Sequence, residues 1–190
     1  MWISMWLPVM AGVGEKVVEA AKRQIGVTVV YDPAYVSLEY PGGDVPRERG
    51  VCTDVVIRAL REGLGRDLQK LVHEDMKGNF AAYPKLWGLK RPDRNIDHRR
   101  VPNLRAYFRR AGYELPVAKG AGYEGFRPGD MVTCTVPPNL PHVMIVSDRK
   151  TGGGRPLMIH NSGAGTREED VLERFEITGH YRITAEGEDR

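Results

Sequence analysis

The chain has 190 residues, of which 41% are apolar and 28% charged, so it can bury one core and stay soluble. The formal net charge is only +3, and basic residues alternate with acidic ones. No segment gathers basic residues with stacking aromatic residues, which argues against binding of nucleic acid. We expect a single domain in which the two cysteines need not form a disulfide.

The two ends of the chain differ in composition from the middle. Residues 1–14 are apolar and end in small residues, like the last part of a secretory signal, although the basic leading part is missing. We therefore expect export to the periplasm or cell envelope, with the cytoplasm as the alternative. No apolar run reaches the roughly 18 residues that cross a bilayer, so no stable membrane span is expected. Residues 185–190 read as a frayed tail.

The first half of the chain has helical patterns. Apolar residues recur at spacings of three and four over residues 15–26, 51–63 and 101–112, and each segment ends at a glycine, so each predicts a helix. Residues 33–50 are rich in proline and glycine and predict a loop. Residues 66–126, which include the last of these helices, read as an insertion in the domain.

The second half has the pattern of strands. The segments MVTCTV, HVMIVSD, PLMIH and ERFEITGHYRI are β-branched or apolar, and turns rich in proline and glycine separate most of them. Because helices come first and strands last, the sequence predicts an α+β fold with an antiparallel sheet.

Cys52 lies where the second predicted helix begins, directly after Val51. The unpaired N–H groups and the positive dipole end of a helix N-terminus stabilise a thiolate and lower its pKa from about 8.5. Arg47 and Arg49 would lower that pKa further, whereas Asp54 would raise it. The position therefore suits a nucleophile, and the alternative is a buried cysteine that only fills space.

A base for this thiol is found by pairing two predicted strands. If HVMIVSD and PLMIH form a hairpin centred near Thr151, His142 lies directly opposite His160. We then expect His142 to act as general base and acid and His160 to orient it, with Asn161 as the substitute for that third role. A metal site or a structural hydrogen bond is the alternative for the histidine pair, but the sequence has none of the CxxC or HxxxH spacings of a zinc site.

The order of QIG, a cysteine at the start of a helix, RPGDMV, HVMIV and MIHNSG resembles the NlpC-type cysteine peptidases. That papain-like superfamily cleaves peptide and amide bonds in bacterial cell walls. The resemblance implies a papain-like domain over residues 15–184, a cysteine helix packed on an antiparallel sheet, and catalytic roles for Cys52, His142 and His160. One departure is that the residue after the cysteine is Thr53, where the superfamily usually has serine.

A second resemblance covers the chain from about Ala20 to Ile183. The stretches GVCTDVVIRALR, LVHEDM, YPKLWGLKRPDRNIDHRRVPNL and ITGHYRI are similar to a bacterial family described as domain of unknown function 1287. This family brings no activity with it.

Other residues are secondary candidates. Tyr31, Asp54 and Asn161 are weaker candidates for contact with substrate, and the insertion would line the cleft. Trp87 and Tyr83 would either contact a sugar or peptide or pack their loop. His98 would either belong to the cleft or hydrogen-bond a loop. We expect structural roles for His73 and His180 and a buried position for Cys134.

The sequence thus favours a cysteine hydrolase acting on peptide or amide bonds, with a peptidoglycan-like substrate, no cofactor, no metal and a monomeric state. A non-catalytic envelope-binding module on a peptidase-like scaffold and a cysteine-dependent acyltransferase stay open as alternatives.

Overall fold

The computed structural model describes residues 11–117 and 122–184. The predictions for residues 1–10 and for the tail at 185–190 lie outside the described residues. The helices are α1 (Val13–Lys22), α2 (Cys52–Leu64), α3 (Leu68–Asn79), η1 (Phe80–Ala82), η2 (Asp97–Arg99) and α4 (Val101–Arg110). The strands are β1 (Val30–Tyr31), β2 (Arg49–Gly50), β3 (Glu114–Leu115), β4 (Met131–Val136), β5 (Leu140–Lys150), β6 (Pro156–Asn161), β7 (Thr166–Glu169) and β8 (Glu176–Tyr181).

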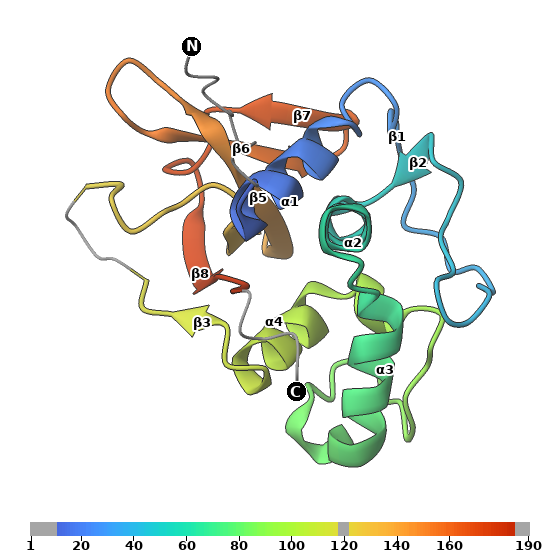
Figure 1. Ribbon diagram of the computed structural model, residues 1–190. Coiled ribbons are helices and arrows are strands. Elements are labelled where there is room, and N and C mark those ends of the chain that lie inside the picture. Colours follow the sequence, from blue (N-terminus) through green and yellow to red (C-terminus); the bar gives the residue numbers. More distant parts are fainter. Residues whose placement is uncertain (1–10, 118–121, 185–190) are drawn as a thin grey trace, which may run out of the picture.

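The predicted α+β class with an antiparallel sheet is confirmed. Six strands form one sheet in the order β3-β8-β4-β5-β6-β7, and every neighbouring pair in it is antiparallel. The short strands β1 and β2 form a separate parallel pair. In Figure 1, α2 lies near the middle of the molecule, between the sheet and the segment that carries β1 and β2.

The sheet is buried on both faces, which explains why its strands read as continuous apolar runs rather than alternating ones. On β5, Val143 and Ile145 pack in the core shared with α1, α2 and α4. Met144 and Val146 face a second apolar cluster that contains Phe126 and the last loops of the chain. Cys52 belongs to the first of these clusters, and His142, which alternates with Val143 along β5, belongs to the face of the second.

Helix α1 begins earlier and ends earlier than the sequence predicts. It covers Val13–Lys22 instead of residues 15–26, and the chain leaves it through a turn in which Gly26 has a φ of 77°. Gln24 is buried in this turn and donates a hydrogen bond from Nε2 to the carbonyl oxygen of Val55. This side chain fixes the end of α1 to α2, a long-range contact that helical spacing does not contain.

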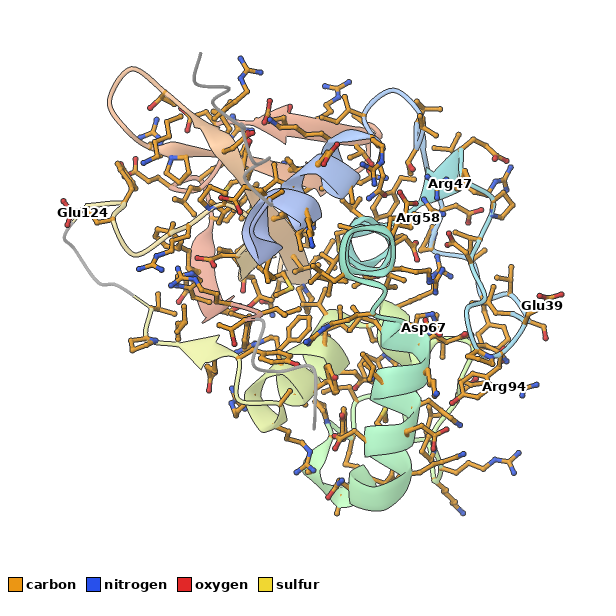
Figure 2. All side chains as sticks on the ribbon, in the orientation of Figure 1. Glu39, Arg47, Arg58, Asp67, Arg94 and Glu124 are labelled. Atoms are coloured by element: carbon orange, nitrogen blue, oxygen red, sulfur yellow. The ribbon has the colours of Figure 1, made fainter. Side chains whose placement is uncertain are left out.

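The proline- and glycine-rich loop before α2 is organised around one buried cation. The Arg58 side chain is 1% exposed, forms a bidentate ion pair with Asp44 at 2.8 and 3.1 Å, and donates hydrogen bonds to the carbonyl oxygens of Val45 and Arg49. Figure 2 shows Arg58 between α2 and this loop, with Arg47 beyond it near β2. A guanidinium, with five donors in a fixed plane, can satisfy several carbonyl groups of an irregular segment at once.

Candidate active site

Cys52 is the first residue of α2, as predicted, and the local sequence explains why the helix starts there. Val51 is the extended residue before the helix, and its N–H donates to Oδ2 of Asp54 at 2.7 Å. Gly50 lies so close to this carboxylate that a Cβ at its position would be 3.0 Å from Oδ2. The glycine therefore permits the turn by which Asp54 reaches back to begin the helix.

Asp54 holds together the segments that surround Cys52. Arg99 pairs with both of its oxygens at 2.9 Å, and both side chains are 2% exposed. The same guanidinium donates to the carbonyl oxygens of Ala34 and Asp32 at 3.0 and 3.2 Å. With its carboxylate held in this way, Asp54 joins the start of α2, the insertion and the loop after β1, which is a different use from the predicted contact with substrate.

The Cys52 thiol differs from the prediction in its protonation. Burial raises its pKa to about 11, and Asp54 acts in the same direction. The backbone N–H groups of Val143, Thr53 and Cys52 itself lower the pKa, but by less than burial raises it. The expected fall below 8.5 is therefore wrong for this resting structure, because removal of solvent outweighs the helix terminus.

The two arginines expected to assist are turned elsewhere. Arg47 pairs with Glu62, and Arg49 pairs with Asp32 at 3.1 Å. Both arginine side chains are about half exposed, at 52% and 44%. Solvent screens their charges and the carboxylates offset them, so neither acts on the buried sulfur.

His142 and His160 are in contact, as expected, but through a different register. Nε2 of His142 lies 2.9 Å from Nδ1 of His160, and the rings meet edge to face with their centroids 5.1 Å apart. The strands pair Ile145 with Ile159, so the predicted position of His142 directly opposite His160 is wrong by two residues. A shift of two keeps both side chains on one face, which is why the histidines still meet diagonally.

The histidine pair is buried and uncharged. Burial lowers the pKa of His142 to about 3, and His160 contributes in the same direction. Burial also lowers the pKa of His160. At neutral pH His142 is therefore a neutral imidazole whose Nε2 is occupied by His160, which leaves Nδ1 as the ring nitrogen available to a substrate or a thiol.

Cys52 adjoins β5 at the backbone of Val143, whereas the His142 side chain belongs to the opposite face of the strand, with Met144 and Val146. The N–H of Val143, the residue after His142, faces the Cys52 sulfur. The hydrogen bonds of residues 11–117 and 122–184 do not include one between that sulfur and the His142 ring. Catalytic hydrogen bonds in resting enzymes are often long and close only when substrate binds, so this geometry is compatible with a nucleophile and its base.

The second thiol also lies near this pair, which the sequence analysis missed. Cys134 is directly opposite His142 in the β4–β5 pair, and it is 1% exposed in the second apolar cluster. Burial raises its pKa to about 12, with a further contribution from Cys52. Both cysteines are free thiols. Only the strand register brings Cys134 to His142, and neither motif nor spacing signals it.

Asn161 connects β6 to the loop before Cys52. Its Nδ2 donates to the carbonyl oxygen of Gly50 at 3.1 Å, and its Oδ1 accepts from the N–H of Gly163 at 3.1 Å. The side chain is fully buried. It fixes the cysteine loop against the strand that carries His160, while His160 itself contacts His142.

A pocket of about 360 Å³ opens onto Cys52. Its lining is mostly apolar: Tyr31, Pro33, Val51, Cys52, Leu86, Trp87, Ile96, Arg99, Arg100, Val101, Pro102 and Pro141. The insertion supplies seven of these twelve side chains, including Trp87, over which the Arg100 guanidinium lies at 4.0 Å from the ring centroid. Burial raises the pKa of Tyr31, and Cys52 contributes, so this tyrosine is near the sulfur.

The remaining aromatic and histidine candidates are outside the lining of this pocket. Tyr83 is 3% exposed and donates to Asp75 at 2.5 Å, which packs the insertion. His73 meets the Tyr40 ring edge to face, and burial lowers the pKa of His98 to about 4. His180 lies 2.7 Å from Asp130. The described ranges 11–117 and 122–184 contain no cluster of three His, Cys, Asp or Glu residues placed to hold a metal ion.

None of the helices in the described part of the chain is both long and apolar enough to cross a membrane. A curated protein of Escherichia coli (strain K12) named "Uncharacterized protein YijF" is 54% identical over 174 residues, which cover 92% of this chain and 83% of that protein. The family model described as "Domain of unknown function (DUF1287)" matches residues 18–183. This match contains α2, the histidine pair and the insertion, and the chain belongs to the DUF1287 family.

Proposed function

We propose that this protein is a cysteine hydrolase of peptide or amide bonds, with Cys52 as nucleophile and His142 as base. The observation that carries the proposal is the position of the Cys52 thiol. It lies at a helix N-terminus, lines a pocket and adjoins Val143, the residue after His142, which forms a buried pair with His160. A cysteine helix packed on an antiparallel sheet, with histidines on two neighbouring strands, is also the arrangement expected of the papain-like NlpC-type peptidases. We extend the proposal to that fold family.

The resting protonation states indicate how the reaction would proceed. Because the pKa of Cys52 is about 11 and that of His142 about 3, both groups are neutral before substrate binds. The thiol proton then passes to Nδ1 of His142 as the sulfur attacks the carbonyl carbon, so proton transfer accompanies bond formation. The N–H groups at the start of α2 are placed to stabilise the oxyanion.

The two half-reactions balance through His142. When the tetrahedral intermediate collapses, the C–N bond breaks and the leaving amine takes the proton from His142, which leaves a thioester on Cys52. Water then attacks the thioester carbon while His142 accepts a proton from it. The C–S bond breaks, a carboxylic acid is released, and the proton returns to the sulfur.

For the substrate we propose a bacterial cell-wall peptide, met after export. The pocket supports a substrate with an apolar group beside the scissile bond, because its walls are apolar apart from Tyr31 and the two arginines. Arg99 is held by Asp54, so Arg100 is the cation with capacity for an anionic group. Arg100 also pairs with Asp97 at 3.2 Å, which would orient it rather than remove its donors.

A binding module without catalysis is the second candidate, and the raised pKa of Cys52 favours it. A thiol that stays protonated needs substrate-driven closure before it can react, and a module would need only the pocket. An acyltransferase would use the same thioester with an amine or hydroxyl in place of water. The products of the reaction separate these possibilities.

Digestion of purified peptidoglycan with wild type and Cys52→Ala, followed by mass analysis of released fragments, tests the proposal. We expect fragments from wild type and none from Cys52→Ala, while Cys134→Ala, the control for the other thiol, keeps activity. Equal fragments from wild type and Cys52→Ala would contradict the nucleophile. Binding by both proteins with no fragments from either would establish the binding module instead.

A further inference from the structure

The charged group beside the outer nitrogen of His160 comes from β7. Glu169 pairs with Met158 across the β6–β7 ladder, and His160 pairs with Arg167, so Glu169 and His160 share one face. Oε2 of Glu169 lies 3.3 Å from Nε2 of His160. That nitrogen is buried and has no well-aligned hydrogen bond to any described residue, so its contact with Glu169 is one of charge and distance in the resting structure. We propose that Glu169 is a positioning residue that fixes the tautomers of both histidines.

The charge of Glu169 determines where the protons of both imidazole rings lie. An ionised carboxylate only accepts, so Nε2 of His160 must carry the proton that faces Glu169. In a neutral ring Nδ1 of His160 is then an acceptor, and Nε2 of His142, 2.9 Å away, must be the donor. The Nδ1 of His142 is left with a lone pair. Glu169 thereby selects the one tautomer of His142 that can take a proton from a thiol.

The surroundings of Glu169 favour its ionised form. Its side chain is 36% exposed, so solvent supports its charge, and Nη1 of Arg167 lies 3.9 Å from its second oxygen. Glu169 raises the pKa of His160, in opposition to burial and to Arg174. The other ionisable groups near the pair are Cys134, opposite His142 on β4, and Cys52, which adjoins β5 at Val143.

Without the carboxylate of Glu169, a second pair of histidine tautomers becomes favourable. A buried N–H with no acceptor costs about 1–3 kcal/mol, so the proton on His160 is favoured to move to Nδ1. Nε2 of His142 must then accept, and its proton moves to Nδ1, where it removes the lone pair. Loss of Glu169 therefore changes the tautomers of both histidines together, although Glu169 contacts only His160.

The catalytic meaning of this inference rests on the proposed function, but the tautomers can be read without any substrate. The test is nitrogen NMR of the full chain with labelled histidine at pH 7.5, in wild type, Glu169→Gln and Glu169→Met. The protonated and bare ring nitrogens differ in chemical shift and in coupling to the ring protons. Asp170→Asn is the matched control, because Asp170 is the adjacent carboxylate of similar exposure, at 37%, and pairs with Arg155 instead.

We expect wild type and Asp170→Asn to carry protons on Nε2 of both histidines. Glu169→Gln keeps an acceptor oxygen and should retain this state, whereas Glu169→Met should move protons to Nδ1 and lower kcat roughly 10- to 100-fold. Wild-type tautomers in Glu169→Met, or Nδ1–H in wild type, would overturn the inference even if hydrolysis depends on Cys52. An inactive wild type with the expected tautomers would overturn the proposed function alone.

Discussion

Two buried histidine clusters lie on the same sheet and differ in the partners that occupy their ring nitrogens. His142 is held by another neutral ring, His160, through one nitrogen, at 2.9 Å. His180 is held by the carboxylate of Asp130 at 2.7 Å, and Asp130 also forms a bidentate pair with Arg182 at 2.7 Å. The first cluster lies beside the pocket of Cys52, and the second has a fixed cation and anion of its own.

The contrast separates a histidine that keeps a free ring nitrogen from one that a charged network holds in place. The hydrogen bonds of Asp130 to His180 and Arg182 hold its pKa low against the effect of burial, which raises it, so this cluster is a charged network. Among residues 11–117 and 122–184, no carboxylate contacts the His142 ring directly, and burial keeps this ring neutral. A neutral imidazole with a free nitrogen can accept a proton, whereas a ring bound to a charged network mainly joins strands.

Replacing each histidine with alanine tests the difference between the two clusters most strongly. His142→Ala should lower the rate of hydrolysis on the order of 10³-fold with little change in fold, because it removes the base. His180→Ala should destabilise the protein by about 1–3 kcal/mol but leave the rate per folded molecule unchanged. Paired measurements of kcat and of urea unfolding check both. Equal catalytic losses in the two variants would remove the distinction.

A change of pH separates the clusters next. The pKa of His142 is lowered to about 3 and that of His98 to about 4, whereas an unfolded histidine titrates near 6.5. The unfolded state binds more protons below that value, so the stability these residues contribute is complete above about pH 6.5. It falls by up to about 1.4 kcal/mol per pH unit for each histidine as the pH decreases.

The pKa of Asp130 is lowered, so its contribution is lost only below about pH 4, the unfolded value of an aspartate. Urea unfolding at pH 7.0, 6.0 and 5.0 isolates the histidines, and His142→Ala should reduce the slope by about one proton. Equal stability at pH 7.0 and 5.0 would show that burial does not keep these rings neutral.

The smallest expected effect concerns the pocket. Of the two clusters, only that of His142 adjoins it, because Pro141, the residue before His142, lines the pocket. Trp87→Ala removes an aromatic wall and should raise KM about three- to tenfold with kcat nearly unchanged, since the ring contacts substrate but not the reacting atoms. Leu89→Ala is the control, because Leu89 has the same exposure as Trp87, 38%, and lies outside the pocket lining. A fall in kcat alone would place Trp87 in the chemistry.

Much of the fold follows from local pattern. The strand Met131–Val136 and the start of α2 at Cys52 are where the sequence predicts them, because apolar runs and a turn before the helix are local signals. The β5–β6 register was missed because Lys150 pairs with Pro156, which centres the turn at Gly153 rather than Thr151, and a shift in pairing between Val146 and Lys150 then corrects only part of this difference. A β-bulge of this kind depends on both strands and leaves no mark in either one alone.

The residues of the candidate site could be named from the sequence, but their protonation states could not. Cys52, His142 and His160 follow from motif order, but the pKa of the thiol depends on how completely the folded chain excludes water from it. Arg99 lies 45 residues after its partner Asp54, and Glu169 belongs to an acidic segment that reads as surface. Their roles arise from tertiary contacts, for which single-sequence patterns carry no information.

The deep setting of the Cys52 sulfur also bears on how long the protein survives outside a reducing environment. Peroxide oxidises thiolates far faster than thiols, so a sulfur with a pKa of about 11 is attacked slowly while the pocket is empty. The same burial would thus protect the proposed nucleophile from irreversible oxidation to a sulfinic or sulfonic acid for as long as no ligand opens the pocket.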